Sequence, residues 1–158
     1  MFILFFTLFF FFFLSSPVLA EHQGAELVQR NGVYYYPSHD DPVNGRVVEW
    51  HSNGQVRTAQ NYNEGERDGI FTEWDEQGNI IKQITYKNKQ KIGEQTYKDG
   101  KLDGPFTEWY KNGQKKMEVI YKDGKLDGPF TEWHKNGQKK MESAYEEGKQ
   151  DGLFNVWY

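Results

Sequence analysis

Five tryptophans and four glutamates recur at fixed spacing along this chain, and their side chains could bind a ligand or transfer a proton. The tryptophans are separated by 24, 35, 24 and 24 residues. A pair of carboxylates can do general-acid catalysis only where two different environments separate their roles. The glutamates occupy equivalent positions of a repeat, so we expect salt-linked or solvated carboxylates and no catalytic residue. The tryptophans are Trp50, Trp74, Trp109, Trp133 and Trp157, and the glutamates that precede four of them are Glu49, Glu73, Glu108 and Glu132.

The histidines and the aspartates of the turns raise a second possibility, metal binding or nucleophilic catalysis. His51 and His134 flank predicted turns, and no two of the four histidines have the spacing of metal ligands or of a nucleophile and its base. The aspartates of the motif KDGKLDG lack the DxDxDG spacing of a calcium loop and match ordinary turn chemistry. We expect no metal site, no cofactor and no enzymatic activity.

A fixed internal period organises the chain. Residues 98–109 and 122–133 both read KDGKLDGPFTEW, and the units 105–128 and 129–152 are identical at eighteen of twenty-four positions. The eleven-residue insert EQTYKDGKLDG repeats only the second half of a unit, which explains the one spacing of 35. Self-similarity in this range predicts a repeat architecture. The predicted segments are a signal peptide (1–20), a degenerate hairpin or cap (21–44), units 45–69 and 69–93, a half-unit (94–104), units 104–128 and 128–152, and a terminal strand (153–158).

Each unit has the pattern of two β-strands joined by a turn. Apolar and polar residues alternate on both sides of Asn112-Gly113, which predicts a two-residue type I′ turn there. Glycine pairs four residues apart, such as Gly124 and Gly128, predict a tight return to the next hairpin. No stretch after residue 21 keeps apolar residues at helical spacing for more than about two turns. The glycines assigned to structural turns are Gly69, Gly93, Gly104, Gly128 and Gly152.

The predicted fold is all-β: an elongated antiparallel β-meander of tandem hairpins, each of about 24 residues, in which a unit touches only its neighbours. We expect about twelve strands, counting a degenerate hairpin around Asn31-Gly32. At roughly 4.8 Å per strand the sheet would be about 55 Å long.

Strand pairing across a two-residue turn would place Phe106 on one face of the sheet and Trp109 with Lys116 on the other. A phenylalanine line and a tryptophan line would then run along opposite faces of the whole array. Contacts of Trp109 with Lys116 and of Trp133 with Lys140 would be cation–π pairs. The tryptophans are either the packing element between units or platforms for a ligand. The candidate binding residues for the second case are Trp50, Trp74, Trp109, Trp133, Trp157, Lys116 and Lys140.

The first twenty residues differ from the rest, with eight of the twelve phenylalanines and no charged side chain. The apolar run Phe2–Leu14 has the length of a signal-peptide core and is short for a membrane-spanning helix. Val18 and Ala20 supply the small side chains that a signal peptidase accepts before its cut. We expect cleavage after Ala20 and export to the periplasm or the medium. An uncleaved membrane anchor is the alternative.

The charges of the remaining chain are unevenly distributed. Residues 21–81 carry four arginines against eleven acidic residues, whereas residues 82–142 carry fourteen lysines against nine. The net charge of −4 implies no strong nucleic-acid field, and we expect no nucleic-acid partner. There is no cysteine, so stability must come from strand pairing and packing without disulfides.

The stretch YKDGKLDGPFTEWYKNGQ resembles the variant MORN repeat, a kind found in bacterial proteins labelled as antitoxins of the YwqK family. The turn GKLDG, the tyrosine before it and the aromatic residue before Asn-Gly carry the resemblance, which extends from about Tyr34 to Tyr158. The resemblance implies β-hairpin arrays that contact other proteins or phospholipids. We therefore predict an exported, non-enzymatic scaffold for protein–protein interaction. The alternatives are a binder of cell-wall glycans through the tryptophans and a binder of phospholipid surfaces through the lysines.

Overall fold

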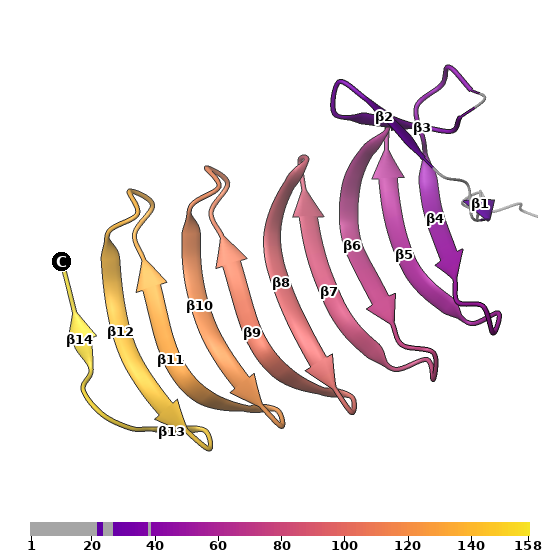
Figure 1. Cartoon of the computed structure of the whole chain (residues 1–158). Coiled ribbons are helices and arrows are strands. Elements are labelled where there is room, and N and C mark those ends of the chain that lie inside the picture. Colours follow the sequence, from indigo (N-terminus) through magenta and orange to yellow (C-terminus); the bar gives the residue numbers. More distant parts are fainter. Residues whose placement is uncertain (1–21, 24–26, 38) are drawn as a thin grey trace, which may run out of the picture.

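A computed structural model describes residues 22–23, 27–37 and 39–158, and all regular structure in these ranges is β-strand (Figure 1). The predicted signal peptide lies outside the described residues. The described part of the chain contains no apolar helix that could cross a membrane. The strands are β1 (His22–Gln23), β2 (Val28–Arg30), β3 (Val33–Tyr35), β4 (Gly45–Trp50), β5 (Val56–Asn63), β6 (Glu66–Trp74), β7 (Ile80–Lys87), β8 (Gln90–Lys98), β9 (Lys101–Trp109), β10 (Lys115–Lys122), β11 (Lys125–Trp133), β12 (Lys139–Glu146), β13 (Lys149–Gln150) and β14 (Asn155–Val156).

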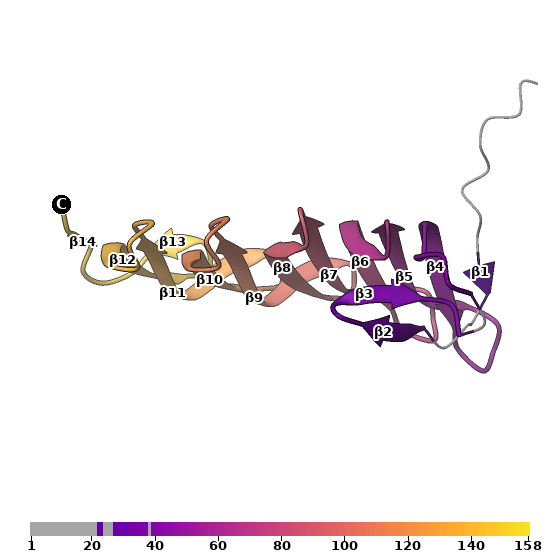
Figure 2. The ribbon, with the colours of Figure 1, turned by 90° about the horizontal axis from the view of Figure 1, so that it is seen from above.

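The strands from β4 to β13 form an antiparallel meander in which each strand pairs with the next. This confirms the predicted all-β meander. Two features differ from the prediction: β1 joins the sheet by parallel pairing with β4, and β2 and β3 form a separate hairpin that turns at Asn31-Gly32. With β14 paired to β12, the main sheet has twelve strands. Seen from above it is a single layer, and the β2–β3 hairpin lies beside one of its faces (Figure 2).

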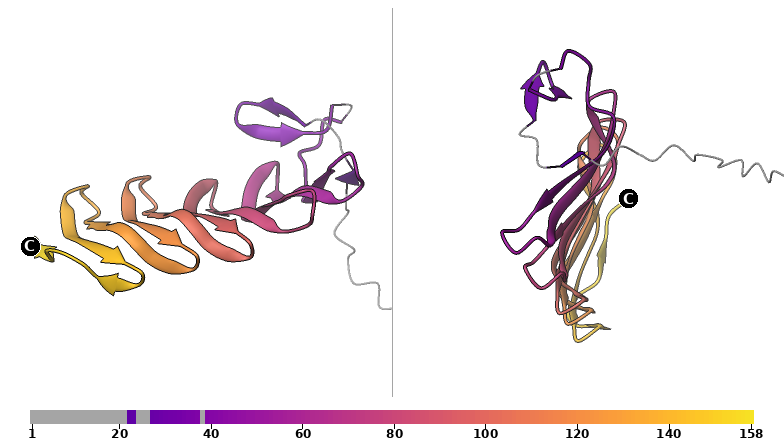
Figure 3. Two further views of the ribbon diagram at one scale, coloured as in Figure 1. Left: turned by 60° about the horizontal axis from the view of Figure 1, so that its bottom comes forward. Right: turned by 90° about the vertical axis from the view of Figure 1, so that its right-hand side faces the viewer.

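The β2–β3 hairpin lies beside the first strands of the sheet (Figure 3). Its side chains complete an apolar core there. Tyr34 N–H donates to the carbonyl of Gly65 at 2.7 Å, and Gly65 N–H donates to Val43 at 2.8 Å. The backbone approaches so closely that a Cβ on Gly65 would clash with Val33. The core consists of the buried Val43, Val47 and Tyr62 and of the partly buried Leu27, Tyr34 and Tyr36.

Two kinds of turn alternate along the sheet. Asp123-Gly124 is a two-residue turn in which both residues have positive φ, 49° and 81°, as a type I′ turn requires. At Asn112-Gly113 the N–H of Tyr110 instead donates to the carbonyl of Gln114 at 2.9 Å, and within this loop only Gly113 has positive φ. The type I′ prediction is therefore wrong at Asn112-Gly113, where the loop contains three residues. In the main sheet the type I′ turns lie at Asp-Gly and its equivalents, and the one Asn-Gly turn of this type is Asn31-Gly32 of the β2–β3 hairpin, with φ of 53° and 85°.

The longer loop shifts the pairing beside it by one residue, and a bulge at Lys116 restores the predicted register further along the strands. Glu108 pairs with Met117 and Phe106 with Val119 as predicted, but Trp109 pairs with Lys115 because Lys116 lies in a bulge. The predicted pairing of Trp109 with Lys116 is wrong for this reason.

The second glycine of each pair also lies elsewhere than predicted. Gly104 is inside β9, where the three residues Asp103–Pro105 lie opposite the single residue Thr96. Its φ of 98° and the 2.6 Å that would separate an added Cβ from Thr96 Oγ1 explain the glycine. The turn assignment therefore needs correction: Gly69, Gly104 and Gly128 lie in β-bulges, and the first glycine of each pair forms the turn. Gly69, Gly104 and Gly128 have positive φ inside β6, β9 and β11, Gly93 lies in β8 without positive φ, and Gly152 lies at a bend after β13.

The half-unit adds one strand, β8, to an array of two-stranded units. This extra strand reverses the direction of every later strand relative to its repeat equivalent in the first units. Strands β4 and β6 point one way in Figure 1, whereas their repeat equivalents β9 and β11 point the opposite way. The chain still advances in the same direction along the sheet. A unit can reverse its strands and keep its direction of advance only by turning over, so the second block (β9–β12) faces the opposite way from the first block (β4–β7).

Strand pairing shows this inversion residue by residue. One row of paired residues, here called face A, runs from Phe71 through Ile84 and Glu94 to Thr107, next to which Trp109 points the same way. The other row, face B, runs from Thr72 through Gln83 and Gln95 to Phe106. The predicted continuous lines are therefore wrong. Phe71 and Phe106 lie on opposite faces, and so do the tryptophans of the two blocks.

Candidate functional site

The tryptophans of the second block are half-buried on face A, and lysines lie over them. The ammonium of Lys91 is 4.3 Å from the ring centre of Trp109, and that of Lys115 is 5.7 Å from Trp133. These contacts are cation–π pairs, but neither involves Lys116, which was the predicted partner. Trp50 and Trp74 are half-buried beside Val48 and Thr72 on face B, and Trp157 is 41 % exposed, so the structure does not bring the five tryptophans together.

Lys116 and Lys140 instead form ion pairs on face B. Lys116 Nζ lies 2.7 Å from Glu108, and Lys140 Nζ lies 2.9 Å from Glu132. Because each lysine sits at a bulge, its side chain points to the face opposite the tryptophan. The carboxylates considered for acid–base catalysis are thus salt-linked at these two positions, and Glu49 is likewise 2.7 Å from Arg57.

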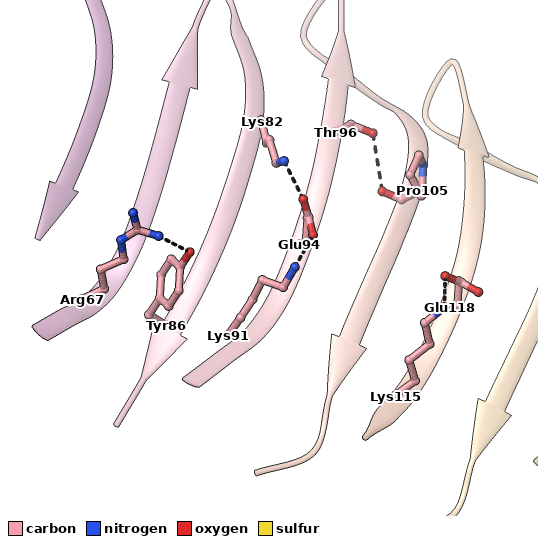
Figure 4. A network of polar contacts seen from close by, with 9 residues as sticks. All are labelled: Arg67, Lys82, Tyr86, Lys91, Glu94, Thr96, Pro105, Lys115 and Glu118. Carbon is pink, nitrogen blue, oxygen red and sulfur yellow. Dashed lines mark hydrogen bonds and ion pairs between the residues drawn. The ribbon is translucent and has the colours of Figure 1, made fainter. Parts of the chain in front are cut away.

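Face A carries a second series of lysine–glutamate pairs, which the sequence analysis missed. Glu94 accepts hydrogen bonds from Lys82 at 2.7 Å and Lys91 at 2.8 Å (Figure 4). Partial burial acts to raise the pKa of Glu94, but the two lysines outweigh it and the pKa is lower than usual. Lys115–Glu118 and Lys139–Glu142 repeat the pair at 2.6 Å in the next units. In a regular strand residues three apart lie on opposite faces, and a bulge between the lysine and the glutamate brings each of these pairs onto one face.

Successive units are tied together at their wide loops. Asn112 Nδ2 donates to the carbonyl of Lys135 at 2.8 Å, and the Tyr110 hydroxyl donates to Trp133 at 2.8 Å. His51 Nε2 hydrogen-bonds to the carbonyl of Trp74 at 2.9 Å in the same way. This histidine therefore links repeats. Within the described residues, no group of three or more His, Asp or Glu is arranged to hold a metal ion.

Arg67 joins the N-terminal hairpin to the sheet. Its guanidinium donates to the hydroxyl of Tyr86 at 3.0 Å (Figure 4). It also lies 5.4 Å from the ring centre of Tyr34 in the hairpin. Burial raises the pKa of the neighbouring Tyr62, although Arg67 acts in the opposite direction. A cavity of about 390 Å³ lies between the hairpin and face A of the first block.

Four tandem segments of the chain match the family model described as the MORN repeat variant, at residues 43–64, 67–88, 102–123 and 126–148. The chain belongs to the MORN repeat variant family. The matched segments leave out residues 89–101, which contain β8, the strand that inverts the second half of this MORN array.

Other comparisons add little about this MORN protein. A search of curated proteins returns no match. Among solved structures, it is similar to a chain described as "Crystal structure of GtfA/B complex bound to UDP and GlcNAc", with 12% sequence identity and a TM-score of 0.38. The similarity covers 73% of this chain and 23% of that chain, and at this TM-score it carries no argument about function.

Proposed function

We propose that this MORN protein is a non-enzymatic binding module whose partner is another protein. The proposal depends on one observation, which is that the sheet has a single layer and leaves aromatic side chains half-buried. Phe106, Tyr121, Phe130 and Tyr145 gather on face B of the second block, and no other described strand packs over them. Clustered, partly exposed aromatic residues on a rigid surface are typical of protein interfaces.

The contacts of the aromatic and basic residues support a protein partner over a glycan or a lipid surface. Sugars stack on open aromatic faces, but Lys91 already covers one side of the Trp109 ring. Anionic lipid headgroups are typically held by clusters of about four to eight cations. Lys115, Lys116 and Lys139 contribute little to such a cluster, because each lies within 2.7 Å of a glutamate.

Export is a separate part of the proposal and is supported by the composition of residues 1–20. If the antitoxin-like role implied by YwqK-type relatives applies, the protein that it neutralises would have to lie outside the cytoplasm. N-terminal sequencing of the protein from fractionated cells should give a mature start at Glu21. A protein that keeps Met1 and stays in the cytoplasmic fraction would contradict export.

The binding function can be tested by covalent capture from cells. The tagged full-length protein is expressed in its source, treated with an amine-reactive cross-linker and purified under denaturing conditions. We expect one cross-linked protein in near-stoichiometric amount. If purified polysaccharide fragments or anionic vesicles bind while no protein is ever captured, the glycan or lipid alternative replaces this proposal.

A further inference from the structure

A groove crosses face B where β8 meets the second block. Two adjoining depressions, of about 290 and 710 Å³, share the lining residues Ile92 and Glu108. The first contains Gln95 and Phe106, and the second continues to Tyr110 at the sheet edge. Together they form one continuous groove in which the apolar and aromatic Ile92, Phe106 and Tyr110 lie among polar side chains such as Gln95 and Glu108.

The first block shows what occupies the equivalent positions there. By repeat position, Val47 corresponds to Phe106 and Glu49 to Glu108. Val47 and Glu49 line the cavity under the β2–β3 hairpin, and Tyr34 of that hairpin closes it. Because β8 inverts the array, the same repeat positions face the other side in the second block, out of reach of the hairpin.

The charge at one end of the groove restricts what it can hold. Lys87, Lys111 and Lys135 line this end, and none of their ammonium groups forms an ion pair or a hydrogen bond with a described residue. Three unpaired cations favour an acidic occupant. The hairpin segment on the first block shows the same combination, since its tyrosines are followed by Asp40 and Asp41.

We propose that this groove binds a β-hairpin or extended segment of a partner protein that carries aromatic side chains and an acidic end. The aromatic side chains fill the floor at Phe106 and Ile92, and the acidic end meets the three lysines. This inference rests on the proposed function and specifies its surface. A second copy of the chain is less suitable as the occupant, because its own hairpin is already packed on its own first block.

The test uses a defined probe, a head-to-tail cyclised peptide with the sequence of residues 27–43. Its binding to the full-length protein is measured by fluorescence anisotropy at low salt. We expect a Kd on the order of 10–100 μM, corresponding to a small interface. K111E/K135E should weaken binding at least about fivefold, whereas K98E/K101E, which makes the same charge change at exposed residues of the opposite edge, should not.

Three outcomes of the peptide experiment would overturn the inference. They are no binding at about 1 mM peptide, equal weakening by both variant pairs, and equal binding of a peptide in which both aspartates are replaced by lysine. Sedimentation that shows a dimer of the full-length protein lost in K111E/K135E would also overturn it, in favour of a second copy. Cross-linking in cells does not depend on this groove, so either experiment can fail while the other succeeds.

Discussion

The first block (β4–β7) and the second block (β9–β12) are built from the same repeat unit but differ in orientation and cover. Val47 and Phe71 of the first block lie on face A, beside the N-terminal hairpin. Their repeat equivalents Phe106 and Phe130 lie on face B, where a groove stays open. The difference shows that a repeat position does not by itself determine which face of a sheet a residue occupies. The number of strands that separate two units does.

The inversion itself gives the largest expected effect, an all-or-none difference in cross-linking. The chain has no cysteine, so E73C/E108C introduces the only two thiols. In the intact protein these residues lie on opposite faces, and a bismaleimide that spans about 10 Å should not join them. Deleting residues 94–104 should put them on one face, two strands apart, and the reagent should then join them.

The control for this prediction is E49C/E73C. Both residues pair with Thr58 from opposite sides within the first block, so they should be joined with or without the deletion. Rapid joining of residues 73 and 108 in the undeleted protein would contradict the inversion.

The packing of the β2–β3 hairpin on the first block gives the next largest expected effect, a difference in unfolding free energy between two glycine substitutions. Gly65 and Gly124 are equivalent turn glycines with φ of 73° and 81°. Alanine at Gly124 should cost about 1–2 kcal/mol of unfolding free energy because of backbone strain alone. Alanine at Gly65 should cost roughly 3 kcal/mol or more, because its Cβ also displaces the hairpin at Val33. Urea unfolding measures both, and equal costs would argue against tight packing of the hairpin.

Alkaline pH should lower the free energy of unfolding through Tyr62, a buried tyrosine of the core beneath the hairpin. Burial raises the pKa of Tyr62, so above the ordinary tyrosine value of 10.0 the unfolded chain loses this proton before the folded one. Stability should therefore fall as pH rises from about 10 to the folded pKa, by at most about 1.4 kcal/mol per pH unit from this group. Y62F should remove that contribution to the slope of unfolding free energy against pH. An unchanged slope would show that Tyr62 is not its source.

Acid pH should give the smallest effect, at the junction between the blocks. The pKa of Glu94 is lowered, so its contribution to stability is present above its unfolded value of 4.5 and is lost as pH falls through the folded pKa. E94Q should cost less than about 1 kcal/mol at pH 7. This cost should decrease as pH falls from 4.5 through the folded pKa, and it should shrink in high salt. E118Q, which removes a carboxylate with one lysine partner, should cost less in the same urea titrations.

The sequence predicted the strands, the hairpins and the order of the meander, because alternation and glycine positions are local signals. It failed at Asn112-Gly113 because the same dipeptide fits a two-residue turn and a three-residue loop, and strand register decides between them. Because of that one-residue difference, the sequence analysis assigned Lys116 to the wrong face and did not identify Lys115 as a lysine that contacts a tryptophan. The inversion was detectable, since the spacing of 35 differs from 24 by a half-unit with a single strand. The groove at Ile92 was not, because it depends on a bulge in β8.

The single added strand has a consequence for how such proteins diverge. Gain or loss of a whole unit during gene duplication does not change the face of the sheet on which the ligand-binding residues of later units lie. An unequal exchange that leaves a half-unit redirects all of them at once, with no change in any contacting residue. Two ligands bound on either side of β8 would then be held back to back and could not compete for space. An insertion of eleven residues can thus convert a sheet that binds ligands on one face into a sheet that holds two molecules on opposite faces.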